Sequence, residues 1–232
     1  MVIGIIAAEK TEMNAIKEYM SDVKEEKVYN LFFFIGKIEN KECVLVECGV
    51  GKVNSGRTTQ ILIDKYKADY VINIGSAGAL TSELKIEDIV IGEKLVQHDF
   101  DITGAGNYEL GEICGIGKFF ESDKKLIKLC KQTIDEFNDR SFNIKLGTIA
   151  TGDWFASIPE KSQKIQKEFN ADCIEMEGAA IAQVCYLDNI PFLVIRGISD
   201  TPNGNNKIDF HTYLEIASKR VAEILKNLIM KI

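Results

Sequence analysis

Two short segments near the end of the chain place acidic residues where chemistry can be done. The first sets Glu175 and Glu177 on either side of Met176, at the expected start of a helix. The second sets Asp200 just beyond an apolar strand, Phe192 to Ile195. Ligands of open α/β sheets sit outside the carboxyl ends of the strands. Carboxylates there can bind hydroxyl groups and move protons, so these segments predict a polar small-molecule site.

Earlier parts of the chain add polar groups to the same predicted site. Glu12 comes just after the first expected strand, and Ser76 lies in Gly75-Ser76-Ala77-Gly78, after a later one. A second glycine segment is Gly49-Val50-Gly51. Glycine permits positive φ and lets a ligand approach the backbone. Neither segment has the spacing of a Rossmann fingerprint or a P-loop, so each, taken alone, is more simply interpreted as a turn.

Each acid also has a purely structural interpretation. Glu12 fits the first turn of a helix, where a negative charge interacts favourably with the helix dipole. Glu175 and Glu177 fit the start of a later helix in the same way. Asp200 fits a turn that continues through Pro202. The sequence alone leaves these alternatives open.

Burial of the paired acids favours a functional interpretation. Met176 between them and Ile174 before them indicate partial burial, and a buried ionised acid needs a partner. Arg196, at the end of a buried strand, has the same need, so we expect Arg196 to pair with Glu175 and Glu177.

Two aromatic residues, Trp154 and Phe155, follow Gly152-Asp153 in an expected loop. Packing into the core is the default for such side chains. The alternative is a stacking face for a flat heterocycle.

The composition narrows the class of protein. A chain of 232 residues with 46% apolar residues fits a single α/β domain spanning residues 1–232. The net charge of −7 argues against binding to nucleic acid or to an anionic membrane. No signal peptide and no run of about 20 apolar residues is seen, so we expect no membrane association and a cytoplasmic location.

Cysteine and histidine spacing predicts neither a disulfide framework nor a metal site. The six cysteines form no Cys-x-x-Cys pair, and we interpret them as small buried hydrophobic residues. His98 and His211 are the only histidines, and their spacing is not that of metal ligands. We therefore expect no metal and no cofactor.

The elements that must position these residues follow from apolar periodicity. Expected strands are Val2–Ala7, Val28–Ile38, Cys43–Cys48, Tyr70–Ile74, Asp88–Val96, Ile144–Thr151 and Pro191–Ile195. Expected helices are Glu9–Met20, Val53–Tyr66, Asp123–Phe137, Pro159–Phe169, Glu177–Leu187 and Phe210–Met230. Residues 99–121 are expected to form a long loop. The alternation predicts an α/β domain with a central mixed, mostly parallel sheet flanked by helices.

Together the segments resemble the nucleoside phosphorylase/nucleosidase family, and within it the bacterial nucleosidases that act on 5′-thio-substituted adenosines. The resemblance covers essentially the whole chain. It rests on six segments in order: Ile3–Ala8 with Glu12, Gly49–Val53, Asn73–Gly78, Thr151–Asp153 with Phe155, Glu175–Glu177, and Arg196 with Ile198–Asp200.

The resemblance implies hydrolysis of the N-glycosidic bond, which releases adenine. Asp200 would be the general acid at purine N7. Glu12 would activate the attacking water, with Arg196 and Ser76 near it. Bond cleavage builds positive charge on the sugar and negative charge on the base, and an acid at the base with carboxylates near the sugar suits both changes.

The resemblance also implies how the nucleoside is bound. Glu177 would hold the ribose hydroxyls, with Met176 against the sugar. Phe155 would stack on adenine, the backbone of Ala156 would read its edge, and Val50 would line the pocket for the 5′ substituent. The implied substrate-binding set is Val50, Ser76, Phe155, Ala156, Glu175, Met176, Glu177, Arg196 and Ser199.

The chain departs from the family pattern in three places. Glu9 stands where the family has an apolar residue near the ribose, and Trp154 replaces a smaller residue. The segment 104–113 looks longer and less aromatic. In the family this region completes the 5′ pocket across a two-fold interface, so we expect a homodimer.

Two alternatives to a hydrolase are a purine nucleoside phosphorylase and a non-catalytic nucleoside-binding protein. A phosphorylase needs cations for phosphate. Asn73 stands where related hexameric phosphorylases have an arginine, and the early loop offers only Lys10. Loss of Glu12 or Asp200 would indicate a non-catalytic protein, and both are present.

Overall fold

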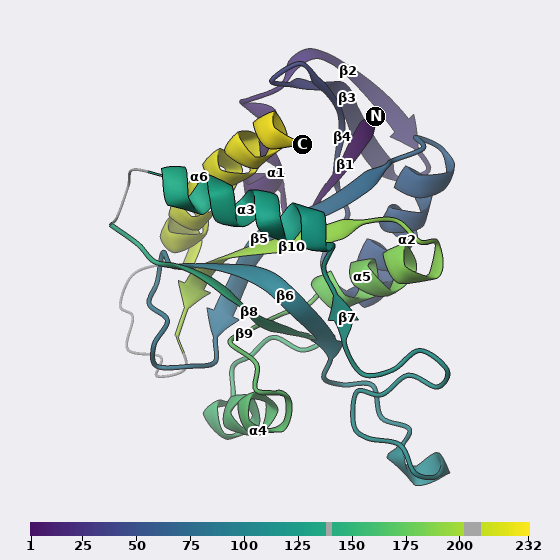
Figure 1. Cartoon of the computed structure of the whole chain (residues 1–232), viewed down its shortest axis with the longest axis vertical. Helices are drawn as coiled ribbons and strands as arrows, with labels where there is room; N and C mark the ends of the chain where they lie inside the picture. Colours follow the sequence, from purple (N-terminus) through teal and green to yellow (C-terminus); the bar gives the residue numbers. More distant parts are fainter. Residues whose placement is uncertain (138–140, 202–209) are drawn as a thin grey trace.

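A mixed sheet of ten strands, with helices on both faces, organises the described part of the chain (Figure 1). The computed structural model describes residues 1–137, 141–201 and 210–232. The strands are β1 (Val2–Ala7), β2 (Ser21–Val28), β3 (Leu31–Ile38), β4 (Lys41–Glu47), β5 (Tyr70–Ala79), β6 (Ile89–Gln97), β7 (Phe120–Glu121), β8 (Ile144–Thr151), β9 (Cys173–Glu175) and β10 (Phe192–Asp200). The helices are α1 (Lys10–Lys17), α2 (Lys52–Asp64), α3 (Lys124–Glu136), α4 (Pro159–Phe169), α5 (Gly178–Leu187) and α6 (Phe210–Lys231), with a 3₁₀ turn, η1 (Thr103–Ala105).

Parallel pairing at the centre of the sheet brings several strand ends together. β1 lies between β4 and β5, β5 lies beside β10, and all three pairings are parallel. The apolar runs that form β1 and the first half of β10 are buried except for the half-buried Val2, as expected for strands covered on both faces. The carboxyl ends of these strands therefore meet at one edge, where the acids predicted from the sequence also lie.

Five strands close into a ring beside this edge. β5 pairs with β10, β10 with β6, β6 with β8, β8 with β9, and β9 returns to β5 in antiparallel register. The closing contacts pair Gly78 with Ile174 and Ala79 with Cys173. Closure carries the end of β9 to the ends of β5 and β10.

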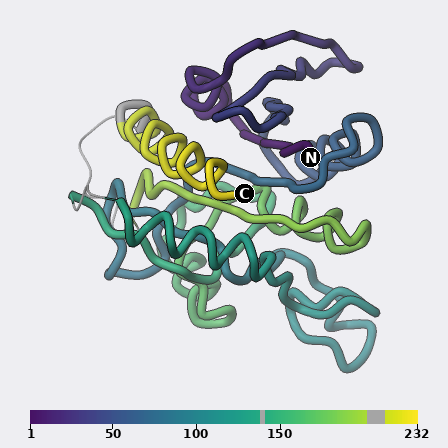
Figure 2. Tube along the Cα trace, turned by 45° about the horizontal axis from the view of Figure 1, so that its top comes forward, coloured from purple at the N-terminus to yellow at the C-terminus, as the bar shows by residue number. Residues whose placement is uncertain are grey.

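Helices fill both faces of the sheet. α1, α3 and α6 cover one face over a cluster that includes Ile5, Ile72 and Leu225, and α2 and α5 cover the other face. Figure 2 shows α6, in yellow, running along the sheet between the N-terminal part of the chain and α3. The core is thus two apolar layers on either side of one sheet.

Most of the expected elements are confirmed. The strand Ile144–Thr151 and the helix Pro159–Phe169 are found at the predicted bounds, and the mixed sheet is present. The antiparallel share of the sheet is larger than expected, because β6, β7 and β9 make antiparallel contacts on the ring side.

Several expected bounds are wrong. Val28–Ile38 is not one strand, because the chain turns at Tyr29 and Asn30 between β2 and β3. β2 is mostly exposed and rich in charge, so it has no apolar alternation to reveal it. β9 was not expected, since a strand of three residues carries too little pattern to detect.

The predictions of buried cysteines and of a long loop at residues 99–121 are confirmed, with one exception each. Five cysteines are buried, but Cys114 is exposed in the segment between β6 and β7. That segment is largely loop, although it contains η1 and ends in β7. None of the described helices has the length and hydropathy needed to span a bilayer.

Candidate active site

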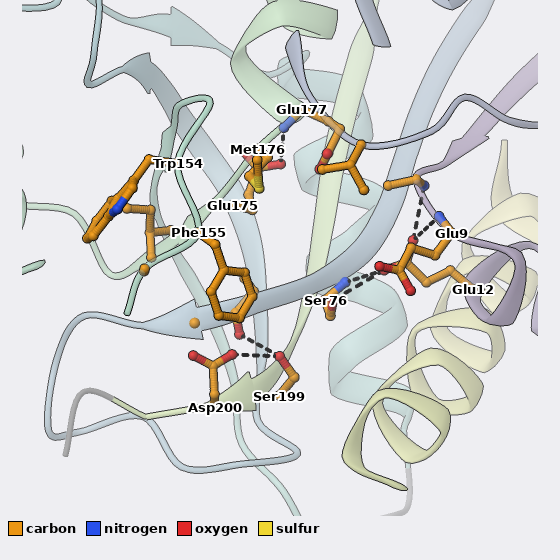
Figure 3. A pocket seen from close by; sticks show the side chains of 16 residues that line it. Glu9, Glu12, Ser76, Trp154, Phe155, Glu175, Met176, Glu177, Ser199 and Asp200 are labelled. Carbon is orange, nitrogen blue, oxygen red and sulfur yellow. Dashed lines mark hydrogen bonds between the residues drawn. The ribbon is translucent and has the colours of Figure 1, made fainter. Parts of the chain in front are cut away.

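A cavity lies where the ends of β1, β5, β9 and β10 meet (Figure 3). Its walls also include the loop after β4 and the loop between β8 and α4. The lining residues are Ala8, Glu9, Glu12, Val50, Ser76, Ala77, Gly78, Trp154, Phe155, Ala156, Ile174, Glu175, Met176, Glu177, Ser199 and Asp200. All the residues that the sequence singled out for the site line this cavity except Arg196, which lies behind its wall.

Glu12 is held by four hydrogen bonds at the junction of β1, α1 and β5. One carboxylate oxygen accepts from the backbone N–H of Ala8 at 3.0 Å and of Glu9 at 3.1 Å. The other accepts from the backbone N–H of Ser76 at 2.9 Å and from its hydroxyl at 3.2 Å. Burial raises the pKa of Glu12, while the nearby Arg196 opposes the shift. A fixed, buried carboxylate with a raised pKa is suited to take a proton.

Glu12 occupies the first turn of α1, as the structural interpretation expected. That interpretation does not exclude the functional one, because the same carboxylate also reaches Ser76 on β5 and faces the cavity. The hydrogen bond between Glu12 and Ser76, which lies on another strand, is not required to start a helix.

Arg196 and Glu175 form a buried ion pair that anchors the wall of the cavity. Arg196 Nη2 donates to Glu175 and, at 2.6 Å, to the side-chain oxygen of Asn73. Glu175 also accepts from the Thr151 hydroxyl and, at 2.7 Å, from the backbone N–H of Gly178. The pairing expected between Arg196 and the acids is therefore confirmed.

Glu177 lies next to this pair but keeps a raised pKa. One of its oxygens accepts from the backbone N–H of Gly51 at 2.9 Å, and the other is 3.7 Å from Arg196 Nη2. Burial and the neighbouring Glu175 raise the pKa of Glu177 to about 7, with Arg196 acting in the opposite direction. Glu177 is thus a carboxylate at the cavity wall whose charge is only partly compensated.

Asp200 ends β10 on another side of the cavity. The Ser199 hydroxyl donates to it at 2.8 Å. Burial raises the pKa of Asp200, and the hydrogen bond from Ser199 opposes the shift. Asp200 belongs to the strand rather than to a free turn, and the expected continuation through Pro202 lies outside the described residues. A carboxyl group with a raised pKa is suited to donate a proton.

Gly75 and Gly78 lie inside β5, so the interpretation of this segment as a turn is wrong. A Cβ on Gly75 would lie 2.5 Å from Arg196 Nη1 and 3.0 Å from Glu12 Oε1. A Cβ on Gly78 would lie 2.8 Å from Asp200 Oδ2. Glycine is needed at both positions because the side chains of Glu12, Arg196 and Asp200 pack directly on the strand backbone.

The two aromatic residues after Gly152 have different environments. Trp154 packs partly on a small apolar cluster around Ile165 and Phe169, as core packing predicts. Phe155 is 62% exposed and lines the cavity, so the core interpretation is wrong for Phe155. Figure 3 shows the Phe155 ring above Asp200. An exposed ring at a cavity wall provides a stacking face.

A polar network fixes three loops around the cavity. Lys52 Nζ donates to Asp99 at 2.6 Å, and the backbone N–H of Lys52 donates to Asp153 at 2.8 Å. Asp99 also accepts from the backbone N–H of Asp153 at 2.9 Å. The network therefore connects the Val50 loop, the Phe155 loop and the start of the segment 99–121.

Sequence reasoning missed the supporting residues of the site. Thr151 and Asn73 belong to the motifs named above, but nothing in the sequence marks them as partners of Glu175 and Arg196. Asp99 had no signal beyond its place at the start of a long loop. Their partners are distant in sequence, so no local pattern could have identified these contacts.

The titratable side chains of the described cavity wall are all acidic. Each titratable side chain that lines it is a carboxylate: Glu9, Glu12, Glu175, Glu177 and Asp200. The nearest cation, Arg196, is buried behind the wall against two of them. Such a site favours neutral or cationic ligands and can stabilise positive charge that develops during a reaction.

Comparison with known proteins shows similarity over the whole chain. A family model described as the phosphorylase superfamily matches residues 2–230. The 5′-methylthioadenosine/S-adenosylhomocysteine nucleosidase of Staphylococcus aureus (strain bovine RF122 / ET3-1) is 38% identical over 232 residues, which is 100% of each chain.

Solved structures agree with this similarity. The 5′-methylthioadenosine/S-adenosyl homocysteine nucleosidase of Campylobacter jejuni superimposes with a TM-score of 0.94 at 33% identity, covering 100% of both chains. The futalosine hydrolase of Helicobacter pylori strain 26695 superimposes with a TM-score of 0.93 at 33% identity, covering 100% of this chain and 98% of that one.

Proposed function

The chain belongs to the phosphorylase superfamily, and we propose that it hydrolyses the N-glycosidic bond of 5′-methylthioadenosine and S-adenosylhomocysteine. The products are adenine and the 5′-substituted ribose. One observation carries the proposal: an acid with a raised pKa stands on either side of one cavity, the half-buried Asp200 near the exposed ring of Phe155 and the buried Glu12 across from it (Figure 3).

Asp200 acts on the base. With adenine stacked on Phe155 and its edge at the backbone of Ala156, Asp200 donates a proton to N7 as the bond between N9 and C1′ breaks. The proton neutralises the negative charge that would otherwise build on the purine, so adenine leaves as a neutral molecule. Ser199 orients the carboxyl group through its hydroxyl.

Glu12 acts on water. The water oxygen forms the new bond to C1′, and its proton passes to Glu12. Arg196 supports this placement of the water. Its Nη1 and Nε are buried and have no hydrogen-bond partner among the described residues, so they remain able to donate to a water. Nη1 and Glu12 Oε1 both lie close to Gly75, so a water beside Gly75 would contact both groups. Ser76 fixes the carboxylate from the other side.

Glu177 and Met176 bind the sugar. A carboxylate accepts hydrogen bonds from the ribose hydroxyls, and its negative charge stabilises the positive charge that grows on the ribose in the transition state. Gly51 holds Glu177 in place, and Val50 extends from the same loop toward the 5′ side.

The charge of the cavity disfavours the phosphorylase alternative. A phosphate dianion would have to approach C1′ past Glu12, with only carboxylates among the described titratable groups that line the wall. Asn73, at the position where related phosphorylases carry an arginine, accepts from Arg196 and donates to the carbonyl of Ile6. Water is therefore the nucleophile.

An assay in phosphate-free buffer tests this function. We expect 5′-methylthioadenosine to be converted to adenine and a reducing sugar, at a rate that added phosphate does not increase. Chromatography of adenine together with a reducing-sugar assay gives both products. A strict requirement for phosphate, with a sugar 1-phosphate as product, would identify a phosphorylase. Absence of adenine under all conditions would favour the non-catalytic binding protein.

The proposal includes a homodimer in which the segment between β6 and β7 helps to close the partner's pocket. Figure 1 shows this segment extending away from the sheet. Exposed apolar side chains lie in this segment (Phe119), in the loop after β4 (Val50), in α2 (Val53) and in α5 (Tyr186 and Leu187). Among the apolar residues of this segment, Phe119 is exposed, whereas Ile113 is buried and Leu110 packs partly on the cluster around Ile165 and Phe169.

We expect sedimentation at micromolar concentration to give the mass of two chains. Val53→Asp, on the exposed face of α2, should shift the equilibrium toward monomers, because a charge at the centre of an apolar interface is costly. The shift should weaken binding of long 5′ groups more than binding of adenine. A fully active monomer would refute both the dimer and the shared pocket.

A role in methionine salvage and a cytoplasmic location complete the proposal. The substrates named above connect the enzyme to the recovery of the methylthio group. Accumulation of 5′-methylthioadenosine in cells that lack the protein, together with cell fractionation, provides the check.

A further inference from the structure

Glu9 lines the cavity but has no role in the chemistry described above. It precedes α1 in an extended conformation, with φ −123° and ψ 155°. Its backbone N–H donates to Glu12, which fixes its position relative to the site. The side chain is partly exposed, and no ion pair joins it to a cation within the described ranges. The Glu9 side chain takes part in a capping box with the backbone N–H of Glu12, so it helps to start α1, but its charge at the cavity wall has no cationic partner among the described residues.

The position of Glu9 relative to a bound nucleoside follows from the rest of the site. Figure 3 shows Phe155 and Asp200 on one side of the cavity and Glu9 on the other. With the base at Phe155 and Asp200 and the ribose at Glu177, the ribose and the 5′ substituent attached to it extend from the base toward the side of the cavity that holds Val50 and Glu9.

The charge of Glu9 interacts with the carboxylate of Glu12 in the cavity wall. Burial is the main reason that the pKa of Glu12 is raised, and repulsion from the Glu9 carboxylate adds to the shift. The two carboxylates are therefore close enough to interact. The described wall offers no cation to compensate Glu9, and Arg196 is already paired with Glu175 and Glu177.

We propose that Glu9 is a specificity-determining residue that favours nucleosides with a positively charged 5′ substituent, such as an alkyl amine, and disfavours those with a negatively charged one. This inference rests on the proposed function, because the orientation of the nucleoside comes from the roles of Phe155, Asp200 and Glu177. An ammonium group gains a favourable interaction with Glu9, and a carboxylate meets repulsion from Glu9 and Glu12 together.

Three 5′-alkylthio-5′-deoxyadenosines of similar length test the proposal. One ends in an amine (3-aminopropylthio), one in a methyl group (butylthio) and one in a carboxylate (2-carboxyethylthio). The quantity measured is kcat/KM for the amine probe divided by kcat/KM for the carboxylate probe. In Glu9→Gln and in Glu9→Met this ratio should fall by about tenfold, the size expected when one attraction and one repulsion between partly exposed charges are removed.

Glu18→Gln is the matched control, because it removes one negative charge from the other end of α1, where Glu18 is exposed. Its ratio should equal that of the unsubstituted protein. Added salt should reduce the ratio in the unsubstituted protein and have little effect in the Glu9 variants, since screening acts on the same charges. Two Glu9 variants are used so that the test remains possible if one of them does not fold.

Equal ratios in the unsubstituted protein and both Glu9 variants would overturn the proposal. Calorimetry separates this failure from failure of the proposed function. The three probes are titrated into Asp200→Asn, with and without Glu9→Gln, so that binding is measured without turnover. If the protein releases no adenine but still loses its preference for the amine probe with Glu9→Gln, the function is wrong and the selectivity stands. If it releases adenine and binding shows no preference, the selectivity is wrong.

Discussion

Asp200→Asn should lower kcat by about 10²- to 10⁴-fold while the protein remains folded. Asparagine has nearly the same shape as aspartate but cannot supply the proton that we propose Asp200 donates to N7. Its side-chain oxygen can still accept from the Ser199 hydroxyl, so the end of β10 keeps its local contacts. Steady-state assays of adenine release, with thermal unfolding measured in parallel, check both parts of this expectation.

The pH dependence of the activity is an independent test of the role of Asp200. Burial raises the pKa of Asp200, so the proton is held to a higher pH than in an exposed aspartate. Activity should fall as pH rises through that pKa, because the acid form is lost. Asp200→Asn should lack this alkaline fall.

Ser199→Ala is a suitable control for Asp200. It removes the hydrogen bond that opposes the raised pKa of Asp200, so the alkaline fall should move to higher pH while the carboxyl group stays. An Asp200→Asn variant within about threefold of the unsubstituted protein would remove Asp200 from the role of acid, since general acid catalysis contributes far more than that.

Glu12→Gln should reduce turnover by a similar factor, about 10²- to 10⁴-fold, and still bind the nucleoside. The role that we propose for Glu12 is to accept a proton from water, which an amide cannot do. The substrate contacts proposed for Phe155 and Glu177 stay in place. Calorimetry with 5′-methylthioadenosine, beside a single-turnover assay, distinguishes loss of chemistry from loss of binding.

The Glu12 variant should also be less stable, for a reason visible in its contacts. The carboxylate accepts four hydrogen bonds, two at each oxygen, and the amide nitrogen of glutamine cannot accept either of the two at its position. Leaving buried donors unsatisfied costs about 1–3 kcal/mol each. Activity must therefore be measured well below the unfolding temperature of the variant.

The acidic side of the pH profile should reflect Glu12 and also Glu177, whose pKa is about 7. A base must be ionised to act, and burial raises the pKa of Glu12, so activity should fall as pH drops through that value. If binding vanished in Glu12→Gln while turnover at high substrate concentration persisted, Glu12 would be a binding residue and another group would activate the water.

The sequence by itself determined the elements whose pattern is local, and the chemical types present at the site. Val2–Ala7 and Pro159–Phe169 are correct to the residue, because a mostly buried apolar run and a proline-initiated amphipathic segment carry their own signals. The motif residues that line the cavity could be named in advance, since most of them follow predicted strands.

Only the tertiary structure decided how those residues combine. β5 and β10 continue past Gly75 and Arg196 because they pair with each other, and β9 exists because it closes the ring against Gly78 and Ala79. The hydrogen bond between Arg196 and Asn73 joins residues 123 positions apart, and that between Glu12 and Ser76 spans 64. Such contacts are made between strand ends that meet only once the sheet has formed, and local periodicity contains no record of them. For the same reason the sequence could identify Glu9 as unusual, but only its place across the cavity from Asp200 shows which part of a nucleoside it would face.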